Sequence, residues 1–550
     1  MFRRLEGAAL DRRKIKRTGL GLEPTSDTPR SVGTVGGLRK ELSVVNLVII
    51  GIVGAVGTGV LFSNAAMTAD AGPGVILAWI IGFVMYLPLT LTYVETAYAY
   101  PEAGGPSRYS AYTHGRTTNI INAFANLFWY LFIPPIEALA TAEGVNYFYP
   151  HLVNAATGDP TTLGALLGVV FMLFFLPFNY FGIKNFGQTT RWLGIVKLFL
   201  YVAAAIGFVT VFRTVNFFRF GGFMPFGMSG VFVAIPLAMF SFGAIRVIPD
   251  YAEEMKEPKR IGRALVWALI GQTVLNLLFA FGFMLALNWH QLKLPVGQWS
   301  SVTKIAGNPF LTIASNANLH WLIAVTLVIA ILGPFVTGYI YQGGGSRTLF
   351  AMSRTGIVSN KLKELNERYA IPFWALLVFT IVGAIVAYIA APLPSIYGLI
   401  GDAVVAGYLG YAINPVVMLA VRRAGHPGLY KAGGLIAGSA FAFASLIVYW
   451  SGWPSVPYAT ILVAVASLVF GVWYKVDAWR NAIWYVAYIA FLVLMTYIGG
   501  VGKLSVLPMP LGSAIVVLVS LAVFLPWGVA ARLPALGQAP TAEASRAVSG

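Results

Sequence analysis

Two groups of residues interrupt apolar stretches of this chain, where exposed backbone groups could bind a ligand at membrane depth. The first comprises Gly51, Gly54 and the run Gly57-Thr58-Gly59, which interrupt an apolar stretch over residues 42–67. The second is the run Phe240-Ser241-Phe242-Gly243 in a later apolar stretch. Backbone groups left open inside a bilayer must be buried in protein or line a wet cavity. Two matched interruptions therefore indicate a binding site between the two stretches.

A helix that stops and restarts at Gly57 exposes backbone groups of both signs. The free N–H groups of the restarting half, with its positive dipole end, attract a carboxylate. Carbonyls at the ends of the first halves, near Val53 to Ala55 and near Phe240 and Ser241, attract a cation such as an ammonium group. The two interruptions together therefore suit a zwitterionic ligand.

A packing role is the alternative for the first group. Gly51, Ala55 and Gly59 have the spacing of a small-residue face on an unbroken helix. Glycines also stand at 54 and 57, which is more than one packing face needs. This favours an interrupted helix.

Charged residues fall inside predicted spans, among them Glu137 and Glu143 in the third, Lys197 in the fifth and Arg246 in the sixth. Each costs about 2.5–3.5 kcal/mol on insertion scales unless it is paired or hydrated. One interpretation is a buried ion pair between Arg246 and Glu137 that braces the two spans. The other is that Arg246 contacts an anionic or polar group of a ligand.

Lys197 lies about eight residues into its span, roughly 12 Å from the inner end at 1.5 Å per residue. Desolvation at that depth favours the neutral amine, which makes proton exchange possible. The alternative is a permanently charged lysine that braces the carbonyls near Gly51 and Val53.

Composition places the chain in the membrane. Hydrophobic residues make up 58% and charged residues 10% of the 550 residues. The net charge of +17 lies mostly in loops, so it reflects topology rather than a nucleic-acid partner. The chain has no cysteine, its histidines lack metal-ligand spacing, and no phosphate-binding loop occurs. We therefore expect no metal site, no ATP-driven cycle and no enzyme activity.

About fourteen membrane spans are predicted, and twelve remain possible if one pair is lost. With the N-terminus inside, only five of the 37 Lys and Arg residues fall in outer loops, and two fall within spans. This bias predicts that both ends are cytoplasmic. The predicted spans are 42–67, 74–99, 118–147, 162–182, 189–212, 230–250, 262–289, 319–350, 371–391, 395–421, 433–452, 457–475, 481–499 and 509–531.

Four motifs in order resemble those of the amino acid–polyamine–organocation (APC) transporters, over roughly residues 38–430. The resemblance is loose in the first span and stronger after the second, where a Tyr-x-Glu and Pro-x-x-Gly-Gly pattern is matched. The motifs are Gly57-Thr58-Gly59-Val60-Leu61-Phe62; Tyr93-Val94-Glu95 with Pro101-Glu102-Ala103-Gly104-Gly105; Phe240-Ser241-Phe242 with Glu253-Glu254-Met255-Lys256-Glu257-Pro258-Lys259-Arg260; and Ser346-Arg347 with Ala351-Met352-Ser353-Arg354-Thr355-Gly356.

The resemblance implies an all-α membrane protein with a five-plus-five inverted repeat, whose first and sixth helices are broken. It divides the chain into a disordered basic cytoplasmic tail (1–40), a ten-helix transport core (41–421), about four additional C-terminal helices (422–531) and a second disordered tail (532–550). It also implies a permease in the cell membrane.

The resemblance further implies that the backbone at both breaks holds the α-carboxylate and α-amino groups of an amino acid. Phe240 falls where the family often places an aromatic lid, and Lys197 falls where sodium-coupled relatives of the fold hold a cation. Arg246 departs from the family, in which many members have an acidic residue. The implied substrate-binding residues are Ala55, Val56, Gly57, Thr58, Gly59, Phe240, Ser241, Phe242 and Gly243.

We therefore expect a secondary active transporter of amino acids that works by alternating access and proton symport, without a cofactor. An exchanger, a polyamine transporter and a non-transporting amino-acid sensor are the alternatives. The expected partners are the substrate and the lipid bilayer, with no nucleic acid. The sequence leaves the particular amino acid and the oligomeric state open.

Overall fold

The computed structural model describes residues 37–154, 158–211, 213–305, 307–391, 395–476 and 479–533, and its regular elements there are helical. Most of the two predicted tails, residues 1–36 and 534–550, lies outside the described residues. The α-helices are α3 Val44–Ala55, α4 Thr58–Leu61, α5 Ser63–Ala71, α6 Val75–Ala99, α7 Tyr109–Val145, α8 Thr162–Phe174, α9 Leu176–Tyr180, α10 Ile183–Thr210, α11 Val215–Phe218, α12 Gly227–Phe242, α13 Val247–Asp250, α14 Ile261–Ala286, α15 Pro309–Asn316, α16 His320–Arg354, α17 Phe373–Ala390, α18 Ser395–Arg423, α19 Gly433–Trp450, α20 Ser455–Trp473, α21 Ile483–Ile498, α22 Met509–Val519 and α23 Leu525–Ala530.

Thirteen stretches of the described helices are long and apolar enough to cross a membrane, and α3 is a shorter apolar helix. One of the thirteen, Thr58–Ala99, joins the end of the first predicted span to the second. The count agrees with fourteen predicted spans when α3 and α4–α5 are taken as the two parts of the first. The inverted relation of the two halves and the division at residue 421 stay predictions.

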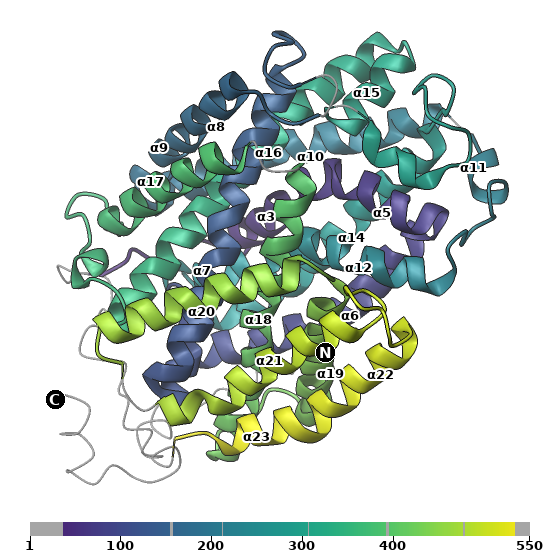
Figure 1. Cartoon of the computed structure of the whole chain (residues 1–550). Helices are drawn as coiled ribbons and strands as arrows, with labels where there is room; N and C mark the ends of the chain where they lie inside the picture. The colour runs from purple at the N-terminus through teal and green to yellow at the C-terminus, as the bar shows by residue number, and fades with distance from the viewer. Residues whose placement is uncertain are drawn as a thin grey trace, which may run out of the picture.

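The first helices lie inside the bundle, and the last ones lie along one side of it. Figure 1 shows α3 in the middle of the bundle among other helices, while α19, α21, α22 and α23 gather in the lower part of the view. Helix α3 contacts α10, α14 and α16, and α7 packs along both α16 and α18. Helix α3 is therefore held by helices that come from distant parts of the sequence.

Burial separates the helices that line the interior from those that face outward. Helices α7 and α18 are almost wholly buried and carry polar side chains, whereas α10 exposes large apolar ones such as Trp192 and Phe199. Exposed apolar side chains on membrane helices contact lipid. A polar solute would therefore bind in the polar interior of the bundle.

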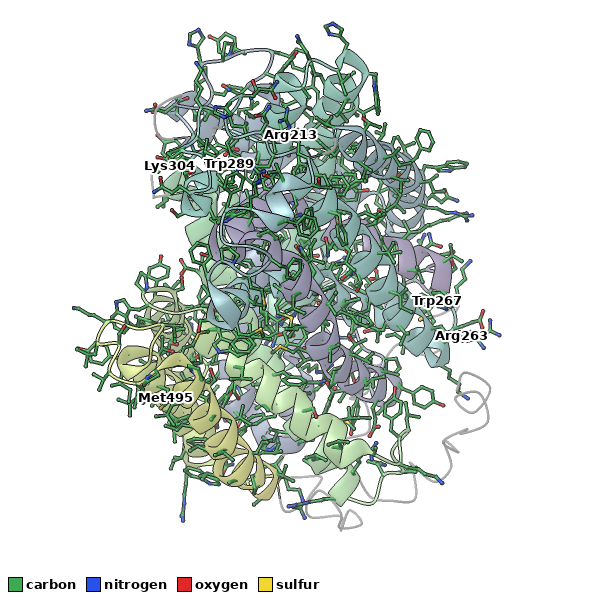
Figure 2. All side chains as sticks on the ribbon, turned by 90° about the vertical axis from the view of Figure 1, so that its right-hand side faces the viewer. Arg213, Arg263, Trp267, Trp289, Lys304 and Met495 are labelled. Atoms are coloured by element: carbon green, nitrogen blue, oxygen red, sulfur yellow. The ribbon has the colours of Figure 1, made fainter. Side chains whose placement is uncertain are left out.

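Two of the basic residues predicted in outer loops lie at the same end of the molecule. Figure 2 shows Arg213 and Lys304 together with Trp289 at that end. Arg263, near the start of α14, lies well away from them. This arrangement agrees with the alternation of loops that the predicted spans require.

Candidate functional site

The first predicted interruption is present between α3 and α4. Helix α3 starts at a capping box of Ser43 and Asn46 and ends at Ala55, and Val56 and Gly57 have non-helical dihedral angles. The N–H groups of Val56, Gly57 and Gly59 have no hydrogen-bond partner among the described residues. Buried N–H groups without partners are rare, so this segment is suited to bind an anion.

Glu137 already occupies part of this helix end. The N–H of Thr58 donates to both carboxylate oxygens of Glu137, at 3.2 and 3.1 Å, and the Thr58 hydroxyl donates to the same carboxylate. A Cβ at Gly57 would lie 2.8 Å from Glu137 Oε1 and 2.7 Å from the hydroxyl oxygen of Thr337, so only glycine fits there. The predicted carboxylate site at Thr58 is thus taken by the protein itself, and the N–H groups around it remain open.

Lys197 holds the end of α3 from the other side. Its buried Nζ donates to the carbonyls of Val53 at 2.8 Å and Gly333 at 2.7 Å, and to Thr337 Oγ1 at 3.0 Å. Gln272 donates to the carbonyl of Gly51 at 2.7 Å. The carbonyls of Gly54 and Ala55 accept no hydrogen bond from the described residues. These two carbonyls remain available for a ligand ammonium group.

The second predicted interruption is wrong in form. Helix α12 continues through Phe242, and a 3-10 turn, η3 (Gly243–Arg246), then leads into α13. The N–H of Gly243 donates to the carbonyl of Phe240, so that carbonyl is not free. Gly243 is the one glycine in the segment, and a 3-10 turn keeps the backbone bonded while narrowing the helix. The chain therefore tightens after Phe242 rather than unwinding at Phe240.

The two segments nevertheless meet through Gly59 and Ser241. A Cβ at Gly59 would lie 2.6 Å from Ser241 Oγ and 3.2 Å from its Cα, so α4 and α12 are in direct contact. The Ser241 hydroxyl is buried and has no hydrogen-bond partner among the described residues. It lies beside the open N–H groups of the first interruption.

The aromatic residues of the second segment face different neighbours. The rings of Phe240 and Trp129 are 5.9 Å apart, and Gly243 packs against the same indole. The ring of Phe242 packs instead against Trp79 and Tyr86 of α6. Phe240 and Ser241 are thus directed toward α7 and α4, and Phe242 is directed toward α6.

Arg246 does not pair with Glu137, contrary to the bracing interpretation. No ion pair of the described residues includes Arg246, and Glu137 binds Thr58. The guanidinium lies over the rings of Trp129 at 5.4 Å and Tyr411 at 4.7 Å. Glu137 stands two turns from Trp129 on α7, about 12 Å along the helix, which is too far for Arg246 to span.

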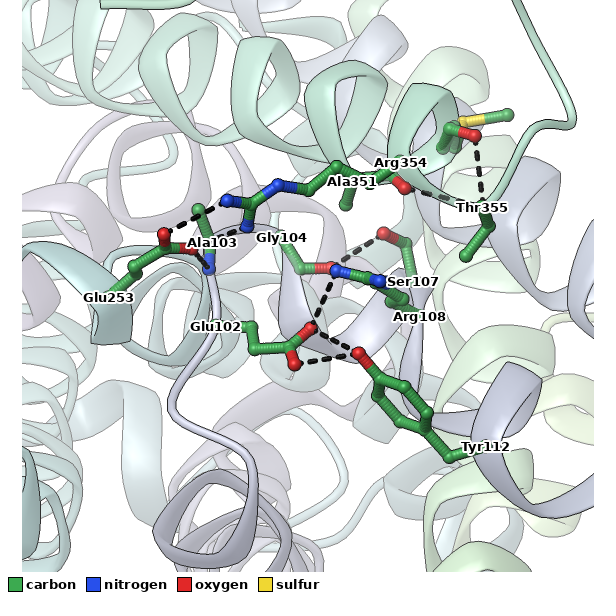
Figure 3. Close-up of polar contacts among 11 residues, drawn as sticks. Glu102, Ala103, Gly104, Ser107, Arg108, Tyr112, Glu253, Ala351, Arg354 and Thr355 are labelled. Carbon is green, nitrogen blue, oxygen red and sulfur yellow. Dashed lines mark hydrogen bonds and ion pairs between the residues drawn. The ribbon is translucent and has the colours of Figure 1, made fainter. Parts of the chain in front are cut away.

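The motif residues outside the spans meet in one charged cluster, formed by Glu102, Arg108, Tyr112, Glu253, Glu254, Arg347 and Arg354. Figure 3 shows Arg354 donating to Glu253, at 2.7 and 3.1 Å, and Arg108 and Tyr112 donating to Glu102 at 3.0 and 2.6 Å. Arg347 and Glu254 form a buried ion pair. The cluster ties α16 to the segments after α6 and α13, which closes this end of the bundle.

Sequence reasoning missed three residues of the site. Thr337 and Gly333 of α16 bind Lys197, and Trp129 of α7 contacts both Phe240 and Arg246. A threonine and a glycine in a long apolar helix carry no local signal of this role. The side chain of Trp129 is likewise one of many aromatics in the chain.

Comparison with known proteins identifies the family. The family model of amino acid permeases matches residues 42–436. An aspartate-proton symporter of Bacillus subtilis (strain 168) is 28% identical over 509 residues, which cover 89% of this chain and 96% of the relative. The glutamate/serine transporter AimA of the same organism is 26% identical over 515 residues, covering 89% and 93%. The branched-chain amino acid permease BcaP, also from that organism, is 24% identical over 453 residues, covering 79% and 92%.

The chain belongs to the amino acid permease family of APC transporters, because the match extends over most of its length. It is a multi-pass membrane protein that transports amino acids. The family and these relatives are transporters and not enzymes.

Proposed function

We propose that this permease is a proton-coupled symporter that binds its substrate between the first interruption and α12. The observation that carries the site is the set of open backbone groups between Gly54 and Gly59. The last of these residues, Gly59, lies against Ser241, whose hydroxyl has no hydrogen-bond partner among the described residues. N–H groups there bind the α-carboxylate, and the carbonyls of Gly54 and Ala55 bind the α-ammonium group. Phe240 closes over the bound zwitterion.

Lys197 supplies the coupling in this proposal. Its ammonium group joins the end of α3 to Gly333 and Thr337 of α16, beside the interruption. Loss of its proton weakens charge-assisted hydrogen bonds to two carbonyls, which loosens α3 from α16. One relative is named an aspartate-proton symporter, which also supports coupling to protons. No other cofactor is needed.

We further propose that the protein lies in the bilayer of the cell membrane with both termini in the cytoplasm. The distribution of Lys and Arg between alternate loops supports this orientation. The charged cluster then lies on the cytoplasmic side. Its ion pairs hold that side closed, so the arrangement described here is one in which the site is shut off from the cytoplasm.

Uptake by purified protein in liposomes tests the coupling. We expect an imposed proton gradient to drive accumulation without sodium, and Lys197→Ala to abolish this accumulation. The matched control is Lys184→Ala, which removes an exposed lysine from the same helix and leaves accumulation unchanged.

Three outcomes would contradict the proposal. Undiminished proton-driven accumulation by Lys197→Ala would exclude the role of Lys197. Flux that needs amino acid on both sides, or sodium, would indicate an exchanger or a sodium symporter. Saturable binding without any flux would indicate a sensor.

A further inference from the structure

Arg246 is a fully buried cation that forms no ion pair with the described residues. Its Nε and Nη2 atoms have no hydrogen-bond partner among the described residues, and Nη1 reaches only the carbonyl of Gly407, at 3.4 Å. A buried charge is costly unless it is paired and hydrogen-bonded. The aromatic rings around it offset part of this cost and provide no negative charge. Among the described residues the guanidinium therefore has no directly bonded anion, and Asp250 acts on it only through a longer-range attraction.

Other arginines of this chain show which edge of the guanidinium receives a carboxylate. Arg347 donates from Nε and Nη2 to the two oxygens of Glu254, and Arg422 donates from the same two atoms to Glu95. This edge matches the geometry of a carboxylate and binds it in two places at once. In Arg246 the corresponding edge is open.

Two groups near Arg246 can donate a further hydrogen bond. The indole Nε1 of Trp129 and the hydroxyl of Tyr93 also lack hydrogen-bond partners among the described residues. The nearby Asp250 accepts a hydrogen bond from Tyr130 through Oδ2, and its Oδ1 remains open. Asp250 makes no ion pair with Arg246, so it is the internal competitor for the site rather than its occupant.

Arg246 is also next to the proposed substrate site. It ends η3, which directly follows the Phe240–Phe242 segment of α12. Trp129 contacts the Phe240 ring on one side and the Arg246 guanidinium on the other. Ala244, also in η3, contacts Gly54 at the end of α3. The side chain of a substrate held at the interruption would therefore reach Arg246 if it extends past Phe240 and Trp129.

We propose that Arg246 binds the side-chain carboxylate of an acidic amino acid and so determines the substrate class. This rests on the proposed function, because the backbone at the first interruption must hold the α-groups. The side-chain carboxylate supplies the missing anion and pairs with the Nε and Nη2 edge. The related permeases are named for acidic, small and branched amino acids, which differ from one another in their side chains. In this proposal, Arg246 is the residue that selects the side chain of the substrate.

Uptake of L-aspartate, L-glutamate, L-asparagine and L-leucine into proteoliposomes tests the assignment. We expect the native protein to favour one acidic amino acid over L-asparagine by at least about tenfold, since a carboxylate gains a charge-assisted bidentate bond. Arg246→Gln should remove this preference, so that uptake of the acidic amino acid falls to no more than that of L-asparagine. Arg219→Gln, at an exposed arginine, is the matched control and should leave the preference intact.

A second variant covers the case in which Arg246→Gln does not fold. Arg246→Lys keeps the positive charge and loses the bidentate edge, so the acidic preference should shrink without reversing. Native preference for L-leucine or L-asparagine, or an unchanged preference in a folded Arg246 variant, would overturn the assignment and leave amino acid transport standing. Absence of flux for every amino acid would overturn the proposed function, and this assignment with it.

Discussion

The first interruption and the charged cluster differ in whether their buried polar groups are hydrogen-bonded. At the interruption, the N–H groups of Gly57 and Gly59 and the hydroxyl of Ser241 are buried and have no hydrogen-bond partner in the part of the chain that the structure describes. In the charged cluster, buried carboxylates such as Glu254 and Glu102 are each bonded by an arginine. Open buried groups are costly until a ligand satisfies them, whereas paired ones hold two helices together. This difference agrees with the proposed roles of the two regions, which are substrate binding at the interruption and closure at the charged cluster.

The same contrast separates Arg246 from Arg347. Both are buried, and only Arg347 has a carboxylate at its Nε and Nη2 edge. A residue that holds a gate closed, as proposed for Arg347, is paired with a carboxylate of the chain itself. A substrate-binding residue, as proposed for Arg246, is paired only while the substrate is bound.

The largest expected effect comes from filling the contact between the interruption and α12. Gly59→Leu would force α4 away from the backbone of Ser241 and cover the open N–H groups. Loss of two hydrogen bonds to a charged group corresponds to a fall in uptake of about 100-fold or more. Uptake in proteoliposomes measures this. Gly434→Leu, at a glycine with open space around it, is the control and should transport normally. Normal uptake by folded Gly59→Leu would mean that the interruption does not bind the substrate.

A smaller loss is expected from Glu137→Gln, which keeps the side-chain shape and removes the charge at Thr58. The hydrogen bonds from Thr58 then lose their charge assistance, and α4 is positioned less firmly. We expect uptake to fall about tenfold at low substrate concentration. The matched control is Glu257→Gln, at an exposed carboxylate paired with Arg260. Equal uptake by both variants would show that Glu137 is only a packing residue.

Much of the fold follows from local sequence, as the interruption illustrates. Four glycines between 51 and 59 sit in an apolar stretch, and the helix does end there. The positions of the long apolar helices likewise follow from hydrophobic length. The form of the second segment did not follow, because a single glycine is compatible with both an unwound and a 3-10 backbone.

The smallest expected effect concerns the charged cluster. Arg354→Gln removes the charge from one largely buried pair, in which each side chain is 8% exposed, and keeps a group that can hydrogen-bond Glu253. The loss of charge assistance is about 1 kcal/mol, so opening of this end should rise by roughly two- to fivefold. The chain has no cysteine, so Ser241→Cys provides a single thiol whose labelling from the cytoplasmic side reports opening. Arg260→Gln, in an exposed pair, is the control. Equal labelling rates with and without Arg354→Gln would show that the charged cluster does not control opening.

The sequence by itself determined that this chain crosses the membrane many times, where its first span is interrupted, and which charges lie at membrane depth. These properties depend on the hydrophobicity and backbone freedom of neighbouring residues, which a linear pattern contains. Only the tertiary structure decided that Glu137 binds Thr58, that Lys197 reaches Gly333 and Thr337, and that Arg246 has no carboxylate. Those partners depend on how each helix is rotated about its axis and how far each side chain reaches. Both are set by packing between helices that are far apart in the sequence.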